Sequence, residues 1–348
     1  MPPSPPAPGQ SSALSSALSS VLAQATSVAT LRRALTNDRV HHAYLFDGPD
    51  GVGKELAAFG LAQALVCENR GVTLPKDDAC GACSACLRAL PRPESRRPVH
   101  PDVIVLERGL YDPATIGRRT QESQDISIDQ VRTLVLARAS FAPHEGRAKV
   151  FLVRRAEELS TSAANALLKT LEEPNKRTHF VLLSAQADSL LSTIRSRTQR
   201  VRFAALPDAV VTKLLVSRGV EALRAQEIAR LSGGSMSSAL GLADEEESAA
   251  RERFVARAMA AIEAPTLGPA LELAEDAKKE KGELPARLAA LATALAVRAI
   301  ANAASETGRE VEAAGLRYQL ALTAIRQLEG NASAQLVVEA MMVRMRSS

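Results

Sequence analysis

A glycine-rich segment, GPDGVGK at residues 48–54, most constrains what this chain can fold into. It follows a short apolar run, AYLFD at 43–47, and precedes a helical segment at 54–67. A strand, a glycine turn and a helix in this order form a phosphate cradle, because glycines let backbone N–H groups face an anion at the helix N-terminus. A glycine turn without a ligand is the alternative. The candidate phosphate-binding residues are Gly48, Gly51, Gly53 and Lys54.

The residue after Lys54 departs from a working phosphate loop. Ser or Thr is needed there, because its hydroxyl holds Mg²⁺, but Glu55 occupies the position. Hydrolysis also needs acidic residues at the end of a neighbouring strand. The apolar run KVFLV at 149–153 ends instead in two arginines, and two glutamates follow in a turn where a solvated position is expected. The metal ligand and the base are therefore expected to be absent together.

An active ATPase remains the rival interpretation. In that case Glu55 is an unusual metal ligand, and Glu157 or Glu158 is the base.

Apolar runs alternate with helical segments over the first two hundred residues. This alternation predicts an α/β fold with a parallel sheet that is covered on both faces. The expected strands are 43–47, 103–106, 149–153, 179–184 and 199–203. The expected helices are 21–40, 54–67, 126–139 and 160–174. In the first, Leu22, Val28, Leu31 and Leu35 fall near one face; in the second, Leu56, Ala57, Leu61, Ala64 and Leu65 are expected to face inward. From Pro207 onward the strand signal disappears, and the remainder is predicted to be all-α.

Composition limits the environment and the partners. The 348-residue chain carries a net charge of +4 and has a pI of about 9.0, which is compatible with nucleic-acid contact. It has no Trp and only 3% aromatic residues, which disfavours base stacking. No apolar run approaches the roughly 18 residues of a membrane span, so no membrane contact is expected. The Pro- and Ser-rich start resembles no secretory signal, so a cytoplasmic location is expected.

Four cysteines fall close together in the sequence. Three of them form CGACSAC, and the fourth lies upstream; they are Cys67, Cys80, Cys83 and Cys86. Two residues between thiols allow a tight turn to aim both at one ion, so the pattern predicts a structural Zn²⁺ site with four thiolates. Disulfides and a redox pair fit less well. An iron–sulfur cluster has the same ligand requirement and stays open. A zinc-dependent nucleic-acid-binding module at 67–90 is a further alternative.

Six motifs occur in one order across residues 41–197: HHAYLFDGPDGVGK, CGACSAC, HPDV, ISIDQVR, AANALLKTLEEP and TIRSR. Together they resemble the bacterial clamp-loader ATPases of the AAA+ class, the gamma/tau and delta-prime subunits of DNA polymerase III. The Pro-, Ser- and Ala-rich start predicts a disordered tail at 1–20. The resemblance implies an AAA+ phosphate-loop domain at 21–204, with a four-cysteine zinc module at 67–90. It further implies a small helical lid domain at 205–244 and a helical oligomerisation (collar) domain at 245–348.

Within that family, gamma/tau subunits hydrolyse ATP, whereas delta-prime subunits are largely inert. Three departures match the inert type: Glu55 after the lysine, Arg154-Arg155 in place of an acidic pair, and Ser237 where the active type has arginine. The resemblance therefore implies a subunit without ATPase activity of its own. It leaves open whether ATP binds at Lys54, and an active gamma/tau-type ATPase is the alternative.

The family's Ser-Arg-Cys motif corresponds to Ser196, Arg197 and Thr198, with Thr in place of Cys. The resemblance implies that Arg197 is an arginine finger, which acts in trans on the ATP site of a neighbouring subunit. The alternative is a solvated basic face of Arg195, Arg197, Arg200 and Arg202. The implied partners are gamma/tau and delta subunits, with the sliding clamp and primed DNA contacted through the complex.

Overall fold

The computed structural model describes residues 16–116, 125–279, 282–302, 308–329 and 332–347. The chain divides into two compact units, Met1–Leu240 and Gly241–Ser348. Across the described ranges, no helix is long and apolar enough to cross a membrane.

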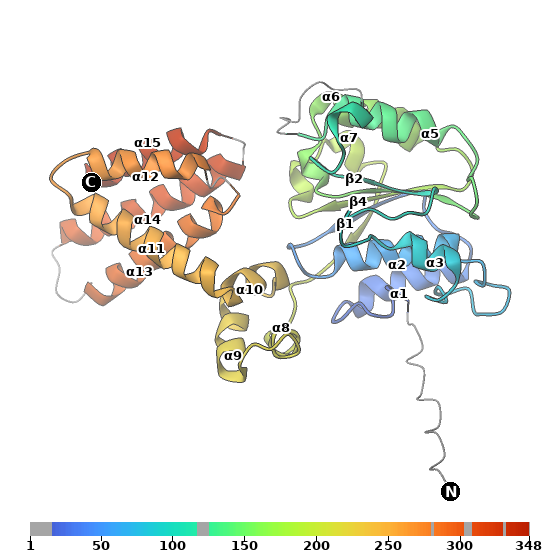
Figure 1. Cartoon of the computed structure of the whole chain (residues 1–348), viewed down its shortest axis with the longest axis horizontal. Helices are drawn as coiled ribbons and strands as arrows, with labels where there is room; N and C mark the ends of the chain where they lie inside the picture. Colours follow the sequence, from blue (N-terminus) through green and yellow to red (C-terminus); the bar gives the residue numbers. More distant parts are fainter. Residues whose placement is uncertain (1–15, 117–124, 280–281, 303–307, 330–331, 348) are drawn as a thin grey trace, which may run out of the picture. The chain divides into compact units, whose positions relative to one another are not determined.

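A five-stranded parallel sheet forms the centre of the first unit (Figure 1). Its strand order is β2-β3-β4-β1-β5, which places β1 between β4 and β5. The inner strands are almost wholly buried apolar runs, as expected for a sheet that is covered on both faces. The strands are β1 Ala43–Asp47, β2 Val103–Leu106, β3 Lys149–Val153, β4 Thr178–Ser184 and β5 Gln199–Arg202. The predicted α/β architecture is confirmed.

Helices cover both faces of this sheet (Figure 1). On one face lie α1 Ala25–Thr36, α2 Lys54–Val66 and α3 Ser84–Ala89. On the other face lie α5 Ala137–Ala139, α6 Thr161–Glu172 and α7 Ser192–Arg195. The helix predicted at 126–139 is built from α4 Ile128–Gln130, a π-helical stretch η2 Val131–Leu136, and α5. Short 3₁₀ turns occur at η1 Pro113–Ile116, η3 Ala156–Glu158 and η4 Ala187–Ser189.

The N-terminal region differs from the sequence expectation. Residues 16–20 belong to the expected tail, but they form a turn in which Leu18 is fully buried. Gly60 of α2 permits this packing, because a Cβ there would lie 2.3 Å from the Leu18 backbone nitrogen. The helix expected from residue 21 begins at Ala25, since Ala23 has a left-handed φ of 56°.

Two leucines that the sequence placed on apolar helix faces are instead exposed. Leu22 precedes the start of α1 and is 47% exposed, and Leu56 lies in the first turn of α2 and is 39% exposed.

Three short helices follow β5: α8 Asp208–Val216, α9 Ala222–Leu231 and α10 Met236–Ala243. The boundary between the two units, after Leu240, falls within α10. The start of α10 lies against the glycine loop. The Ser235 hydroxyl donates to the Asp50 carbonyl at 2.7 Å, and a Cβ on Gly51 would lie 2.2 Å from the Ser237 backbone nitrogen. Position 51 therefore requires glycine, both for this close approach and for its φ of 73°.

The second unit is wholly helical within its described residues, as predicted. Its core is built from alanine, leucine, valine and methionine side chains contributed by all five helices. The helices are α11 Glu245–Glu263, α12 Gly268–Lys279, α13 Leu284–Asn302, α14 Gly308–Glu329 and α15 Ala334–Arg346.

Candidate nucleotide and metal sites

The glycine loop runs from the end of β1 to the start of α2, at the carboxyl edge of the sheet. Lys54, the first residue of α2, is 7% exposed. Its ammonium donates to the carbonyl oxygens of Gly48 and Pro49, the latter at 2.6 Å, and lies 3.6 Å from the Asp50 carboxylate. Burial lowers the pKa of Lys54. The charge that would meet a phosphate is thus bound by the loop's own oxygens.

Glu55 and Arg154, the two departures beside the loop, form an ion pair with a distance of 2.5 Å. Arg154 follows β3, and its side chain is 9% exposed. The same guanidinium donates to the Glu107 carboxylate at 2.7 Å and to the Arg96 carbonyl at 3.1 Å. Arg96 in turn pairs with Glu107 through its guanidinium. An arginine held between two carboxylates therefore stands beside the loop.

The following residues are also engaged within the chain. Arg155 has a left-handed φ of 48° and pairs with Glu158 at 3.1 Å and with Asp50 at 3.8 Å. Glu157 accepts a hydrogen bond from the Ala185 backbone N–H at 3.3 Å. Its other carboxylate oxygen is buried without a hydrogen-bond partner among the described residues. The glutamate pair was expected to be solvated, but Glu157 is half-buried and the Glu158 side chain is only 18% exposed.

These groups surround a cavity of about 470 Å³. Basic and acidic residues line it in equal number: Lys54, Arg96, Arg154 and Arg155, and Asp50, Glu55, Glu107 and Glu157. Ser237 from α10 also lines the cavity and contributes a hydroxyl. Two lining residues, Arg96 and Glu107, were missed from the sequence. The signal for Glu107 was a charged residue directly after the apolar run of β2.

Arg197 lies away from this cavity, after α7. Its guanidinium pairs with Glu172, the last residue of α6, with one N–H···O distance of 2.7 Å. A further N–H donates to the Thr193 carbonyl at 2.9 Å. The side chain is 32% exposed and is therefore open to solvent on one side. The Thr198 hydroxyl donates to the Ile194 carbonyl at 3.2 Å, so the replacement of Cys by Thr is accommodated within the turn.

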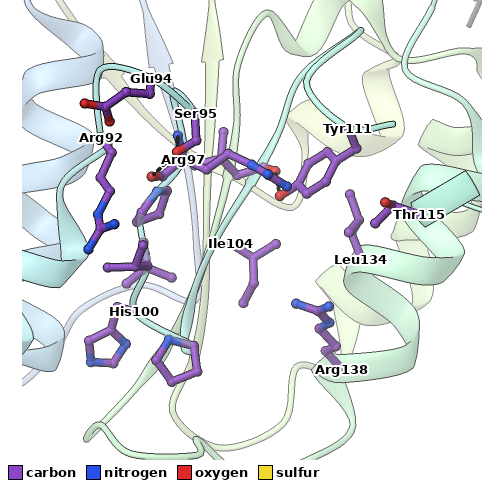
Figure 2. A pocket seen from close by; sticks show the side chains of 15 residues that line it. Arg92, Glu94, Ser95, Arg97, His100, Ile104, Tyr111, Thr115, Leu134 and Arg138 are labelled. Carbon is purple, nitrogen blue, oxygen red and sulfur yellow. Dashed lines mark hydrogen bonds between the residues drawn. The ribbon is translucent and has the colours of Figure 1, made fainter. Parts of the chain in front are cut away.

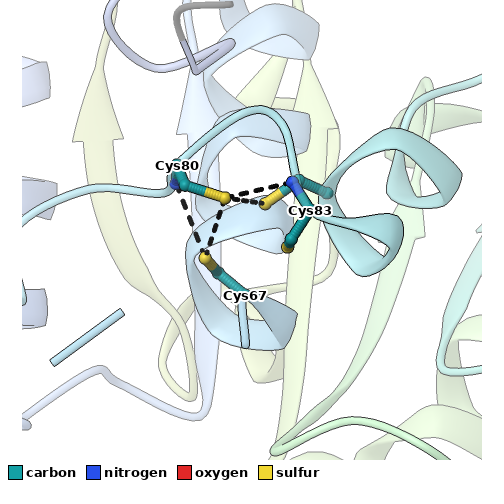
Figure 3. Close-up of side chains that lie close together, drawn as sticks. Cys67, Cys80 and Cys83 are labelled. Atoms are coloured by element: carbon teal, nitrogen blue, oxygen red, sulfur yellow. Dashed lines mark hydrogen bonds between the residues drawn. The ribbon is translucent and has the colours of Figure 1, made fainter. Parts of the chain in front are cut away.

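The four cysteines meet in space. All four Sγ atoms lie within 4.8 Å of one another, and Figure 3 shows Cys67, Cys80 and Cys83 with their sulfurs turned together. The Cys80 sulfur lies 3.6 Å from that of Cys67 and 3.7 Å from that of Cys86. Four thiolates at 2.3 Å from one zinc ion stand about 3.8 Å apart, so the observed separations fit a tetrahedral donor set.

Local hydrogen bonds favour the thiolate form of Cys80. Burial opposes ionisation, but backbone N–H groups of Cys83 and Ala82 outweigh it, and the pKa of Cys80 falls to about 6. The Cys83 N–H lies 3.2 Å from this sulfur. Cys67 ends α2 and Cys86 lies in α3, so two helices and the loop between them bring the set together.

Comparison with known proteins identifies relatives of the first unit. The sequence model of the family described as "DNA polymerase III, delta subunit" matches residues 23–207, more than half of the chain. The DNA polymerase III subunit gamma/tau of Mycobacterium bovis is 36% identical over 187 residues, which is 54% of this chain and 28% of that protein. The DNA polymerase III subunit delta' of Pseudomonas aeruginosa is 37% identical over 199 residues, which is 56% of this chain and 53% of that protein.

The matched region thus spans about half the length, or less, of these curated relatives. Among solved structures, a DNA polymerase III gamma subunit-related protein of Thermotoga maritima is similar, at 19% identity and a TM-score of 0.47. That similarity covers 92% of this chain and 99% of the other. Since the family's sequence model matches more than half of it, the chain belongs to the DNA polymerase III delta subunit family of clamp-loader proteins.

Proposed function

We propose that this chain is a delta-prime-type subunit of the DNA polymerase III clamp loader and does not hydrolyse ATP. The carrying observation is the Glu55–Arg154–Glu107 network beside the phosphate loop. An active loop holds Mg²⁺ there, and the ion bridges phosphate oxygens and neutralises developing charge. The Arg154 guanidinium donates to Glu55, to Glu107 and to the Arg96 carbonyl, so Glu55 is paired with an arginine and is not free to ligate a metal ion. The Lys54 ammonium donates to carbonyl oxygens of its own loop, so it can bind a phosphate only after those hydrogen bonds break.

ATP turnover by the isolated full-length chain tests this proposal. We expect hydrolysis at background level in the presence of Mg²⁺, with no further loss on Lys54→Ala. Hydrolysis well above background that Lys54→Ala abolished would establish an active ATPase and refute the proposal. Calorimetry with ATP, with and without Mg²⁺, separates binding from turnover.

The proposed contribution to catalysis is made in trans by Arg197. An arginine supplies a permanently charged planar fork that stabilises charge on a transferring phosphoryl group. Partial exposure of Arg197 and its position beside the end of α6 support a role at a subunit boundary. In a reconstituted loader, Arg197→Ala should leave assembly intact and reduce ATPase activity of the complex. Arg195→Ala is the matched control, because Arg195 is a similarly exposed arginine of the same turn that pairs with Asp188. Equal rates in the two variants would contradict the assignment.

We further propose that Cys67, Cys80, Cys83 and Cys86 hold a structural zinc ion. The donor set is four sulfurs at separations that fit a tetrahedron, which leaves no position for a reacting water. When bound, zinc would cross-link the end of α2 to α3 and the intervening loop. Metal analysis should find about one zinc per chain, and Cys80→Ser should release it. An absorbance spectrum typical of an iron–sulfur cluster would instead assign the same ligands to iron.

The proposed partners are gamma/tau and delta subunits, with primed DNA and the sliding clamp contacted through the complex. Large apolar side chains exposed on the second unit support its proposed role in oligomerisation; Ile300 is 77% exposed and Val297 is 61% exposed. Ile300→Asp should weaken co-elution with gamma/tau and delta, whereas Thr293→Asp, at another exposed position of α13, serves as the control. Unchanged assembly with Ile300→Asp would remove this helix from the interface.

A further inference from the structure

A second cavity, of about 560 Å³, lies along the edge strand β2 (Figure 2). Its walls come from the strand itself, from the loop that joins α3 to β2, and from the helical segment that ends in α5. It shares no lining residue with the cavity at the phosphate loop. The two sites can therefore be altered separately.

Three arginines line this cavity: Arg92 and Arg97 from the loop, and Arg138 from α5. Within the described residues, none of the three forms an ion pair with a carboxylate. Neighbouring arginines behave differently, since Arg88 pairs with Glu145 at 2.5 Å and Arg96 pairs with Glu107. Glu94 is the one acid among the lining residues that the structure describes. The cavity thus gathers positive charge that the described protein leaves uncompensated.

The loop holds two of these arginines in place. The Arg92 N–H donates to the Arg97 carbonyl at 3.0 Å, and the Arg96 N–H donates to the Arg92 carbonyl at 2.8 Å, which closes a tight turn. The Arg97 guanidinium lies over the Tyr111 ring, 4.7 Å from its centroid. The Tyr111 hydroxyl donates to the carbonyl of Val105 in β2 at 2.8 Å. Arg97 is therefore positioned before any ligand arrives.

Arg138 faces the same region from the opposite wall (Figure 2). Burial raises the pKa of Tyr111, and the charges of Arg97 and Arg138 both oppose that rise. Two cations from different elements therefore act on one hydroxyl. An anion in the cavity would be attracted by both charges.

We propose that this cavity binds a small anion that carries more than one phosphate group. Guanidinium forks match phosphate oxygens in paired hydrogen bonds, and Arg97 and Arg138 approach from two sides. The Thr115 hydroxyl of the lining is an additional donor. A volume of about 560 Å³ lies within the range of small-molecule sites. The inference does not depend on the state of the phosphate loop or on clamp loading.

Calorimetry of the full-length chain with tripolyphosphate and with pyrophosphate tests the proposal. We expect saturable binding that weakens at least tenfold in Arg138→Gln and in Arg92→Gln; both residues are exposed, so these variants should keep the fold. The matched control is Arg132→Gln, which removes an exposed arginine from the same helical segment. Lys54→Ala is a second control, and it should leave the affinity unchanged.

ATP and a short single-stranded oligonucleotide serve as comparison ligands, because phosphate can come from a free compound or from nucleic acid. ATP binding that is lost in Arg138→Gln but kept in Lys54→Ala would support the proposal. No heat with any phosphate compound at millimolar concentration would overturn it. Equal affinities for Arg138→Gln and Arg132→Gln would do the same, as would Arg138-dependent binding of the oligonucleotide alone.

Discussion

Glu55 and Arg154 are 99 positions apart in the sequence, yet they form an ion pair with a distance of 2.5 Å beside the phosphate loop. Each is a departure from the residue that an active phosphate-loop ATPase places there, and each is the other's partner. The two residues therefore form one arrangement, an internal ion pair beside the phosphate loop. Glu107 extends this arrangement on the other side of the guanidinium.

Because Arg154 is the buried member of this network, removing it should be the costly change. Arg154→Ala should lower the free energy of unfolding by about 2–3 kcal/mol, since Glu107 loses one of its two cations in a nearly buried position. Glu55→Ala should cost less than about 1 kcal/mol, because the Glu55 side chain is 49% exposed and its pairing is screened by solvent.

Urea unfolding measures both values, with Arg155→Ala as the control, because the Arg155 side chain is 55% exposed. If the free energy of unfolding fell by more than about 2 kcal/mol in the control, or did not fall in Arg154→Ala, the prediction that burial of the arginine decides the cost would be contradicted.

The sheet and its helices were largely predictable from the sequence. Buried parallel strands are short unbroken apolar runs, and amphipathic helices have apolar residues every three or four positions. Longer-range packing was not predictable. The residues around Gly60 in the sequence do not indicate that the backbone of Leu18 packs against this glycine of α2. Nor do they indicate that the Gln24 side-chain amide donates to the Ala204 carbonyl and accepts from the Ala204 N–H. Such contacts join segments that are far apart in the sequence, and no periodic pattern of residue types indicates them.

At the candidate sites, residue types were predictable and partners were not. The sequence indicated that Glu55 and Arg154 are unusual, but not that they touch. The arginines along β2 gave no signal either, since each is an ordinary surface residue in the sequence. Only their convergence on one cavity distinguishes Arg97 and Arg138 from the paired arginines around them.

The contact between Arg197 and Glu172 predicts that the planar shape of the guanidinium matters more for the function of residue 197 than its positive charge alone. The guanidinium pairs with the carboxylate through two of its nitrogens and donates to Thr193 through the third. Arg197→Lys keeps the positive charge but cannot form this fork. In the reconstituted loader, its ATPase rate should therefore fall nearly as far as that of Arg197→Ala. Arg195→Lys is the control and should leave the rate unchanged; full activity of Arg197→Lys would show that a point charge suffices.

Asp102 makes the stability of the sheet edge sensitive to acid. The carboxylate is fully buried, and it accepts the backbone N–H groups of His144, Glu145 and Gly146 at 2.6, 2.8 and 2.7 Å. Burial alone would raise the pKa of Asp102, but the three N–H groups outweigh it and lower the pKa below its ordinary value of 3.8. A depressed pKa stabilises the fold above pH 3.8, and this contribution is lost as the pH falls below that value.

Asp102→Asn should accordingly lower the free energy of unfolding at pH 7 by about 1–3 kcal/mol, because a neutral amide cannot accept all three bonds. The difference in unfolding free energy between Asp102→Asn and the unaltered chain should become smaller only below pH 3.8. Urea unfolding at a series of pH values measures this. Asp129→Asn, at a position 41% exposed, is the control and should show little effect at any pH. A difference that narrowed already near neutral pH would assign the effect to another group.

The backbone conformation of Ala23 predicts that glycine at this position would remove strain. It is exposed and has a φ of 56°, a left-handed conformation that costs an L-residue about 1–2 kcal/mol relative to glycine. Glycine adopts it freely, although its greater freedom in the unfolded chain offsets part of the gain. Ala23→Gly should therefore raise the free energy of unfolding by up to about 1 kcal/mol. The opposite sign is expected for Ala29→Gly in the interior of α1, where glycine costs about 1 kcal/mol. Thermal or urea unfolding of the two variants side by side gives the comparison, and destabilisation by both would show that the turn before α1 is not strained.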